Sequence, residues 1–405
     1  MESDNKLFLL DAYALIYRAY YAFIKNPRIN SKGFNTSAIL GFVNTLEEVL
    51  KKENPTHIGV AFDPAGPTFR HEAFEQYKAQ REETPEAIRL SVPIIKEIIR
   101  AYRIPILEVA GYEADDVIGT LATEAGRQGI ITYMMTPDKD YGQLVSDKVF
   151  MYRPKHTGGF EVMGVDEVKA KFDIQSPAQV IDMLGLMGDS SDNIPGCPGV
   201  GEKTAQKLIA EFGSIENLLE HTDQLKGALK TKVETNREMI TFSKFLATIK
   251  IDVPIQLDMD SLVREQADED SLRQIFEELE FRTLIDRVLK KENAGNGITT
   301  PTGNKTAAEK SNLAPLPLFP EEGGAVQGDL FANFTGNEPG EAKNSNLATL
   351  ETLNCDYQLI DTEEKRTKII QKLLTSKILS LDTETTGTEP MDAELVGMSF
   401  SIAEN

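Results

Sequence analysis

Several features that mark other classes of protein are scarce in this sequence. The chain has two cysteines, Cys197 and Cys355, which lie far apart and form neither a metal-ligand pattern nor a disulfide framework. This scarcity fits a reducing compartment. No stretch approaches the ~18 apolar residues that a membrane helix needs, and the acidic start, MESDNKLFLLD, does not resemble a signal peptide. We therefore expect a cytoplasmic protein.

Positive charge is also in short supply. The 405 residues include 43 Lys and Arg against 64 Asp and Glu, which gives a formal net charge of −21. Because phosphate groups attract Lys and Arg, this balance argues against a nucleic-acid partner. The location of the charges along the chain, however, matters more than their sum.

The length predicts two or three domains, and a hydrophobic fraction of 40% excludes a chain that is disordered throughout. Near the N-terminus, short apolar runs alternate with segments of helical periodicity. The apolar runs are Lys6–Leu10, His57–Phe62, Ile104–Ala110 and Ile130–Met135, and the helical segments are Ala12–Ala22, Thr36–Glu53, Pro85–Tyr102 and Ala114–Gln128. This alternation predicts a largely parallel sheet of the α/β class, with the functional site at the carboxyl ends of the strands.

The rest of the chain divides into three parts. From Ser176 the pattern is helical, with amphipathic segments at Pro177–Met187, Thr204–Phe212, Ser214–Glu220, Leu225–Phe245 and Asp270–Lys290. We therefore predict an α/β domain at 1–175, a helical subdomain at 176–290, a flexible linker at 291–348 and a second α/β unit at 349–405. The GDLFANF piece of the linker is either a docking peptide or part of a plain tether. The last unit is too short to close such a fold, so we expect a piece of a longer protein.

Acidic residues gather where the predicted strands end. Three acids each follow an apolar run, and the groups GYEADD, TPDKD and GDSSDN add others. The nine carboxylates are Asp11, Asp63, Glu113, Asp115, Asp116, Asp138, Asp140, Asp189 and Asp192. Taken singly, each is more simply explained as a turn residue or a helix cap. Together they would repel one another strongly unless cations lay among them, and oxygen ligands without His or Cys favour Mg²⁺ or Mn²⁺ and two-metal phosphoryl transfer.

A glycine-rich turn joins two predicted helices. It is not a P-loop, because Glu202 separates Gly201 from Lys203. Gly199 and Gly201 permit a tight turn whose backbone N–H groups face outward at a helix start, a phosphate-binding geometry without base readout. Lys203 and Lys207 would add charge contacts. The alternative interpretation is an ordinary connection between helices.

Two basic segments accompany these motifs. FRHEAFEQYKAQR (Phe69–Arg81) follows Asp63, and its composition alone is typical of a solvated helical face. The second set either follows a duplex backbone or is surface charge; it consists of Lys226, Lys230, Lys232, Arg237, Lys244 and Lys250.

Residues 1–290 as a whole resemble the 5′ nuclease (flap endonuclease) domain family of bacterial DNA polymerase I. The matching stretches occur in the family's order: LLDAYALIYRAYYA, AFDPAGPTFRHEAFEQYKAQR, GYEADDVIGTLA, TPDKDYGQLV and GDSSDNIPGCPGVGEKTA. The resemblance implies a PIN-like fold with a helix-hairpin-helix subdomain, and it assigns all nine carboxylates to divalent metal ions.

The resemblance also implies roles for the basic and glycine motifs. Arg70, Lys78 and Arg81 match basic residues of the family's helical arch, which contact the scissile phosphate, and we assign them to catalysis. Tyr77 lies where an aromatic ring can stack on a base. The residues that match the duplex-gripping turn, which can also hold K⁺, are Gly199, Gly201 and Lys203, with Lys207 nearby.

The tail ILSLDTETTG resembles the start of an RNase H-like 3′–5′ exonuclease domain. Asp382 and Glu384 match its first metal-binding pair. The family's further acids and its polymerase domain are not in this chain, so we expect it neither to proofread nor to polymerise by itself.

The function implied is a Mg²⁺-dependent nuclease that cuts at junctions of duplex and 5′ single strand, on DNA with a 5′ flap, nick or RNA primer. The protein would be a monomer at the nucleoid with a polymerase domain in cis. Two alternatives stay open: a PIN-like ribonuclease, against which the glycine turn and arch segment argue, and a non-catalytic DNA-binding module. On the main hypothesis, much of the acidity serves to recruit cations, which answers the objection from net charge.

Overall fold

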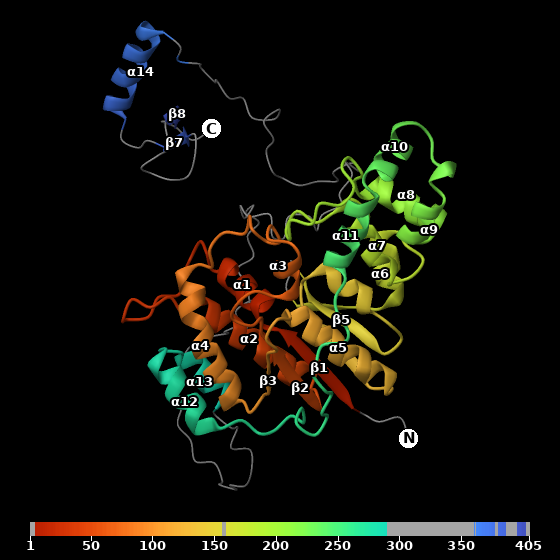
Figure 1. Cartoon of the computed structure of the whole chain (residues 1–405). Coiled ribbons are helices and arrows are strands. Elements are labelled where there is room, and N and C mark those ends of the chain that lie inside the picture. Colours follow the sequence, from red (N-terminus) through yellow and green to blue (C-terminus); the bar gives the residue numbers. More distant parts are fainter. Residues whose placement is uncertain are drawn as a thin grey trace, which may run out of the picture. The chain divides into compact units, whose positions relative to one another are not determined.

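The computed structural model describes residues 5–155, 159–289, 360, 362–376, 380–385 and 395–401 (Figure 1). The chain forms two compact units, 1–331 and 332–405. The elements of the first unit are β1 (Lys6–Asp11), α1 (Ala12–Ala22), α2 (Ser37–Lys52), β2 (His57–Ala61), α3 (Phe69–Ala73), α4 (Glu86–Ala101), β3 (Ile106–Leu107), α5 (Ala114–Arg127), β4 (Ile131–Met135), η1 (Lys139–Leu144), β5 (Val149–Pro154), β6 (Phe160–Met163), α6 (Val165–Phe172), α7 (Gln179–Met187), α8 (Glu202–Phe212), α9 (Ile215–Glu220), η2 (Thr222–Gln224), α10 (Gly227–Thr235), α11 (Arg237–Ala247), α12 (Glu269–Glu278) and α13 (Arg282–Val288).

A mostly parallel sheet organises this unit. Over the described residues it has six strands in the order β3-β2-β1-β4-β5-β6. β1 pairs in parallel with β2 and β4, and β4 pairs in parallel with β5, whereas β6 returns antiparallel to β5. The predicted α/β class is confirmed. The sequence pattern did not predict β5 and β6.

The central strand β1 shows why the sheet forms here. Leu7 and Leu9 belong to the core on one face, with side chains of α5 and α7, while Phe8 and Leu10 belong to the core on the other face, with α1 and α2. A strand covered on both faces needs apolar residues at successive positions, which explains the run LFLL. Asp11 ends this strand at its carboxyl end.

Helices α7 to α11 gather at one end of the unit (Figure 1). The predicted single helix Leu225–Phe245 is two helices, α10 and α11, which meet at Asn236. Helices α12 and α13 pack elsewhere: Leu272 and Phe276 share a core with Ile95 of α4. This last helical pair therefore packs on the sheet domain, although we predicted it as part of the 176–290 subdomain.

The second unit contains α14 (Glu363–Thr375) and the antiparallel strands β7 (Ser380–Thr385) and β8 (Leu395–Ser401). Asp382 and Glu384 lie in β7. The predicted linker at 291–348 lies outside the described residues. Among the residues that are described, no helix is both long enough and apolar enough to cross a membrane.

Candidate active site and metal centre

Acidic side chains lie together at the carboxyl ends of the central strands, as predicted. Asp11 ends β1, Asp63 follows β2 and Asp138 follows β4. Burial, together with the charge of Asp63, raises the pKa of Asp11 to about 7, and burial raises the pKa of Asp63. Burial disfavours the charged form of both carboxyl groups; the charge of Asp63 adds to this effect at Asp11, whereas Lys78 partly opposes it at Asp63.

The first turn of α5 brings a second acidic group to the same edge. Glu113 is the N-cap residue of α5, and carboxylate oxygens of Glu113, Asp115 and Asp116 lie within 4.8 Å of one another. Asp63 Oδ1 accepts a hydrogen bond of 2.7 Å from the Ala114 N–H, which ties β2 to this helix start. Burial and the charge of Asp116 hold the pKa of Asp115 well above its usual range.

The loop after β4 supplies a third acidic group. Asp138 caps η1 by accepting a 2.9 Å hydrogen bond from the Asp140 N–H. Burial and the charge of Asp138 raise the pKa of Asp140 well above its usual range, and Asp140 Oδ1 is a buried oxygen without a hydrogen-bond partner. Asp189 instead pairs with Lys139 at 2.6 Å.

Lys78 and Arg81 of the predicted arch segment lie directly against two of the acids. Lys78 Nζ is 2.6 Å from Glu113 Oε1 and 3.6 Å from Asp192 Oδ2, and Arg81 Nη2 is 2.5 Å from Asp192 Oδ1. Burial would raise the pKa of Asp192, but Lys78 and Arg81 hold it at about 2. Burial is likewise outweighed at Glu113, where Lys78 and Arg70 lower the pKa.

The backbone of the arch segment is docked on the acidic loop as well. The Lys78 N–H donates to the Asp192 carbonyl at 3.1 Å, and Asn193 Nδ2 donates to the Gln76 carbonyl at 2.7 Å. Lys78 has a φ of 57°, in the left-handed region that few side chains adopt. This turn of the backbone accompanies the placement of the Lys78 ammonium over the carboxylates.

Tyr77 does not lie as predicted. We expected a ring available for stacking on a base, but Tyr77 is 3% exposed. Its hydroxyl lies 3.0 Å from Glu113 Oε2 and 3.0 Å from Asp192 Oδ2. A ring with a polar tip can be buried in this way because the tip finds acceptors inside, so Tyr77 here belongs to the charge network.

Arg70 and Asp116 also differ from their predicted roles. Arg70 is 1% exposed and forms a bidentate pair with the fully buried Asp116. A phosphate in solvent cannot reach an arginine enclosed in this way, and the oxygens of Asp116 are already taken by protein donors. Neither the predicted phosphate contact of Arg70 nor the predicted metal ligation by Asp116 fits this geometry.

Two residues that the sequence reasoning missed bind the acid at the end of β1. The Tyr141 hydroxyl and Thr136 Oγ1 lie 3.1 Å and 3.2 Å from Asp11 Oδ2. Tyr141 is fully buried. Both residues lie in the stretch TPDKDY, close to Asp138, and this proximity could have indicated them. They were missed because the sequence reasoning considered only acidic residues and not hydroxyl donors.

The predicted glycine turn joins α7 to α8, and Gly199 and Gly201 are exposed in it. Gly201 is the N-cap residue of α8, and Gly199 has a φ of +75°, which favours glycine. Lys203 and Lys207 are exposed on α8. Lys232 of α10 donates to the Gly199 carbonyl at 3.2 Å, which adds an ammonium group beside the turn.

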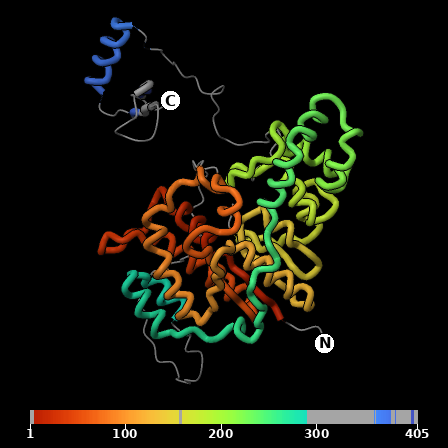
Figure 2. Tube along the Cα trace, viewed as in Figure 1, coloured from red at the N-terminus to blue at the C-terminus, as the bar shows by residue number. Residues whose placement is uncertain are grey.

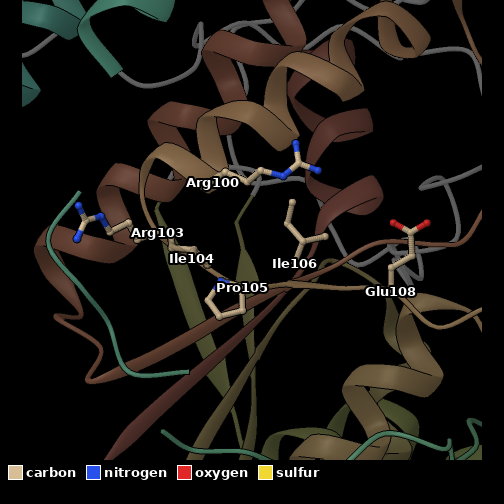
Figure 3. Close-up of a pocket in the computed structure, with 6 residues that line it drawn as sticks. All are labelled: Arg100, Arg103, Ile104, Pro105, Ile106 and Glu108. Carbon is tan, nitrogen blue, oxygen red and sulfur yellow. The ribbon is translucent and has the colours of Figure 1, made fainter. Parts of the chain in front are cut away.

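An open pocket of about 570 Å³ lies elsewhere, where α4 leads into β3 (Figure 3). Its lining residues are Arg100, Arg103, Ile104, Pro105, Ile106 and Glu108. None of the predicted site residues lines this pocket, so it is not the acidic centre.

The donor chemistry of the acidic centre fits hard divalent cations. The candidate ligands are oxygens, and one of them is buried without a partner. Burial and mutual repulsion raise the pKa values of Asp11, Asp63 and Asp115. Mg²⁺ and Mn²⁺ prefer such ligands. The residues that would hold these ions are Asp11, Asp63, Asp115, Asp138 and Asp140.

Comparisons with known proteins agree with this architecture. The chain is similar to DNA polymerase I of Bacillus caldotenax, with 42% identity over 287 residues, which cover 70% of this chain and 32% of that protein. It is similar to DNA polymerase I of Chloroflexus aurantiacus, with 35% identity over 400 residues, 98% of this chain and 40% of that protein. The chain therefore spans well under half the length of these relatives.

A solved structure of the T5 5′-exonuclease with bound divalent metal ions (zinc) has the same fold, with a TM-score of 0.51 and 21% identity over 68% of this chain and 99% of that one. Two family models match successive parts of the sequence. The 5′-3′ exonuclease N-terminal resolvase-like domain matches residues 6–173, and the 5′-3′ exonuclease C-terminal SAM fold matches residues 175–270. The chain belongs to the 5′-3′ exonuclease family.

Proposed function

We propose that this chain is a divalent-metal-dependent nuclease that hydrolyses DNA phosphodiesters at junctions of duplex and 5′ single strand, leaving 5′-phosphate and 3′-hydroxyl ends. One observation carries the proposal: Asp11, Asp63 and Asp140 at the strand ends have raised pKa values, and the cations Lys78 and Arg81, which pair with the neighbouring Glu113 and Asp192, also act on Asp63. Membership of the 5′-3′ exonuclease family supports the reaction type.

The two kinds of side chain have complementary roles. When bound, two divalent ions, Mg²⁺ or Mn²⁺, would lower the pKa of the attacking water and neutralise the phosphate. The residues that would hold those ions are Asp11, Asp63, Asp115, Asp138 and Asp140. Lys78 and Arg81 break their ion pairs with Glu113 and Asp192 and contact the scissile phosphate instead. There the two cations stabilise the charge that develops in the transition state.

The helical part supplies a grip on the duplex. The exposed turn at Gly199 and Gly201, with Lys203 and Lys207 on the following helix, offers backbone N–H groups and positive charge to a phosphate backbone. We infer that this turn binds the duplex side of a 5′ flap, nick or RNA primer, with K⁺ as an additional cation there.

The relatives suggest the setting of this activity. We infer that the nuclease works as a monomer in cis with a polymerase domain, at the nucleoid, during primer removal and repair. On the same inference, Asp382 and Glu384 of β7 are the first metal-binding pair of a 3′–5′ exonuclease unit.

The decisive experiment compares cleavage of a 5′-flap duplex with cleavage of single-stranded RNA, in Mg²⁺ and in EDTA. Asp138→Asn tests the metal centre, and Asp147→Asn, at an exposed acid, is the matched control. We expect flap product in Mg²⁺ from the unmodified chain and the control, and none from Asp138→Asn or in EDTA. Cleavage of RNA but not flaps would favour the ribonuclease, and flap binding without product would favour a binding module; either result overturns the proposal.

A further inference from the structure

We propose that Arg70 and Asp116 form a positioning pair that contacts neither substrate nor metal and that fixes the arch cations relative to the acids of α5. The inference rests on the proposed nuclease function for its kinetic consequence, but the geometry of the pair stands independently. It reassigns two residues that the sequence had placed in the phosphate-binding and metal-binding sets.

Every donor of Arg70 is used inside the protein. A guanidinium has five N–H groups. Arg70 Nε donates to the Leu246 carbonyl at 2.9 Å, Nη1 donates to Glu113 Oε2 at 2.9 Å and Asp116 Oδ2 at 2.8 Å, and Nη2 donates to Asp116 Oδ1 and the Thr248 carbonyl, both at 2.8 Å. Five donors meet five acceptors, so no N–H group remains for a phosphate.

Asp116 is satisfied in the same way. A carboxylate offers about four lone-pair sites. Besides the two bonds from Arg70, Asp116 Oδ1 accepts from the Lys250 N–H at 2.8 Å and Oδ2 accepts from the Glu113 N–H at 3.1 Å. A metal ion at Asp116 would have to displace one of these buried bonds, which distinguishes Asp116 from Asp140, whose Oδ1 has no partner.

The pair joins three elements that are distant in sequence. Arg70 lies on α3, at the base of the arch segment, Asp116 lies on the first turn of α5, and the two carbonyls lie at the end of α11. Such carbonyls have no partner within their own helix, and a cation there is favourable. In Figure 2 the orange segment that contains α3 lies beside the green α11. The rings of Phe69 and Phe245 also join these two helices, with their centroids 6.0 Å apart.

Glu113 transmits this arrangement to the arch cations. Its Oε2 accepts from Arg70, and its Oε1 holds the Lys78 ammonium at 2.6 Å. The Asp116 carboxylate fixes the backbone of Glu113 through its N–H. Loss of the pair would therefore let Lys78 and Asp115 shift relative to each other, and a displacement of about 1 Å in an active site costs on the order of 10²-fold in rate.

The test uses Asp116→Asn, with the adjacent Asp115→Asn as the matched control, and counts bound Mn²⁺ by calorimetry. We expect Asp116→Asn to bind as many ions as the unmodified chain and Asp115→Asn to bind fewer or bind them more weakly. An equal loss in both variants would make Asp116 a metal ligand and would overturn the inference.

A second arm covers variants that fold poorly. Arg70→Met and Asp116→Leu are made singly and together, and unfolding is measured in EDTA. Breaking a buried ion pair destabilises a fold strongly, whereas replacing both partners by apolar groups is often neutral. We therefore expect the double variant to recover stability relative to either single variant. Additive losses would contradict a pair.

The kcat and KM of flap cleavage are measured at a temperature where all variants are folded. These values distinguish a positioning role from an effect on stability. We expect the double variant to lose about 10–100-fold in kcat, with KM changed far less, and Arg70→Lys to recover part of the loss. An unchanged kcat, or an effect on KM alone, would overturn the positioning role. An unmodified chain without nuclease activity would instead refute the proposed function and leave the ion count and the stability coupling as tests of the pair.

Discussion

The nine carboxylates of the centre form two sets that differ in what neutralises them. The compensated set is bonded to side-chain cations of the protein and consists of Glu113, Asp116, Asp189 and Asp192. The uncompensated set has raised pKa values and consists of Asp11, Asp63, Asp115, Asp138 and Asp140. The compensated set is also the more buried: Glu113, Asp116 and Asp189 are buried, whereas in the uncompensated set only Asp11 is.

The difference shows where a cation is needed. Lys78 and Arg81 beside Asp192 hold its pKa at about 2, whereas burial and the negative charge of Asp63 raise the pKa of Asp11 to about 7. A divalent ion therefore relieves the uncompensated set and competes with lysine and arginine for the compensated set.

Asp140→Asn is expected to reduce flap cleavage by about 10³-fold. Mutating a residue that only hydrogen-bonds to a metal ligand costs about 10–100-fold, and losing a ligand itself should cost more. The measurement is single-turnover cleavage together with calorimetric Mn²⁺ binding. Asp189→Asn, in the compensated set, should cost less in both. Equal losses in the two variants would remove the distinction between the sets.

Lys78→Ala should change catalysis and metal binding in opposite directions. Cleavage should fall by roughly 10²-fold or more because the phosphate loses a charged partner. Mn²⁺ affinity should rise, because the ammonium no longer competes for Glu113. Lys207→Ala, at an exposed lysine of α8, is the control for a general loss of charge. Weaker Mn²⁺ binding by Lys78→Ala would contradict competition.

The stability of the metal-free protein should depend on pH in a defined direction. The pKa of Asp11 rises from 3.8 to about 7 in the fold, so between these values the folded state holds the proton that the unfolded chain has lost. Stability is then fully present below pH 4 and is lost as the pH rises toward 7. Urea unfolding in EDTA should show a loss of at least about 1 kcal/mol between pH 5 and pH 8, since one pKa unit corresponds to about 1.4 kcal/mol.

Two controls sharpen this pH prediction. Asp11→Asn should flatten the dependence, and Mg²⁺ should restore stability mainly at pH 8, where the carboxylates are charged. An unfolding free energy that stays constant between pH 5 and pH 8 in EDTA would contradict the raised pKa of Asp11, because the lowered pKa values of the compensated acids act below this range.

Local patterns were sufficient to predict the central sheet and its acids. An apolar run that ends in an acid indicates both a buried strand and the position of its carboxyl end, as at Leu10 and Asp11. β5 was missed because the connection from β4 contains η1 rather than a helix of normal length, so the expected strand–helix alternation fails there. At the break between α10 and α11 the residue is Asn236, a weaker helix-end signal than glycine, and the helical periodicity continues past it.

The division of the acids could not be predicted from spacing. All nine have the same chemistry in sequence, and their partners come from distant segments: Arg70 reaches a carbonyl 176 residues away, at Leu246. Which acid meets a cation depends on how α3 and α11 pack against α5. Resemblance to a family transfers residue identities, but it does not show which of them a buried arginine has already neutralised.

Tyr77→Phe makes the smallest change and tests the hydroxyl between the compensated acids Glu113 and Asp192. The variant keeps the ring and removes one hydrogen bond to a charged group, which should cost about 1.5–3 kcal/mol of stability, with a few-fold loss of cleavage as the arch cations loosen. Urea unfolding and flap cleavage measure the two effects, and Tyr141→Phe, which removes a hydroxyl from the uncompensated Asp11, is the matched control. A ring that acted by stacking on a base would leave Tyr77→Phe as stable and as active as the unmodified chain. That result would separate Tyr77 from the charge network, because only the ring would then matter.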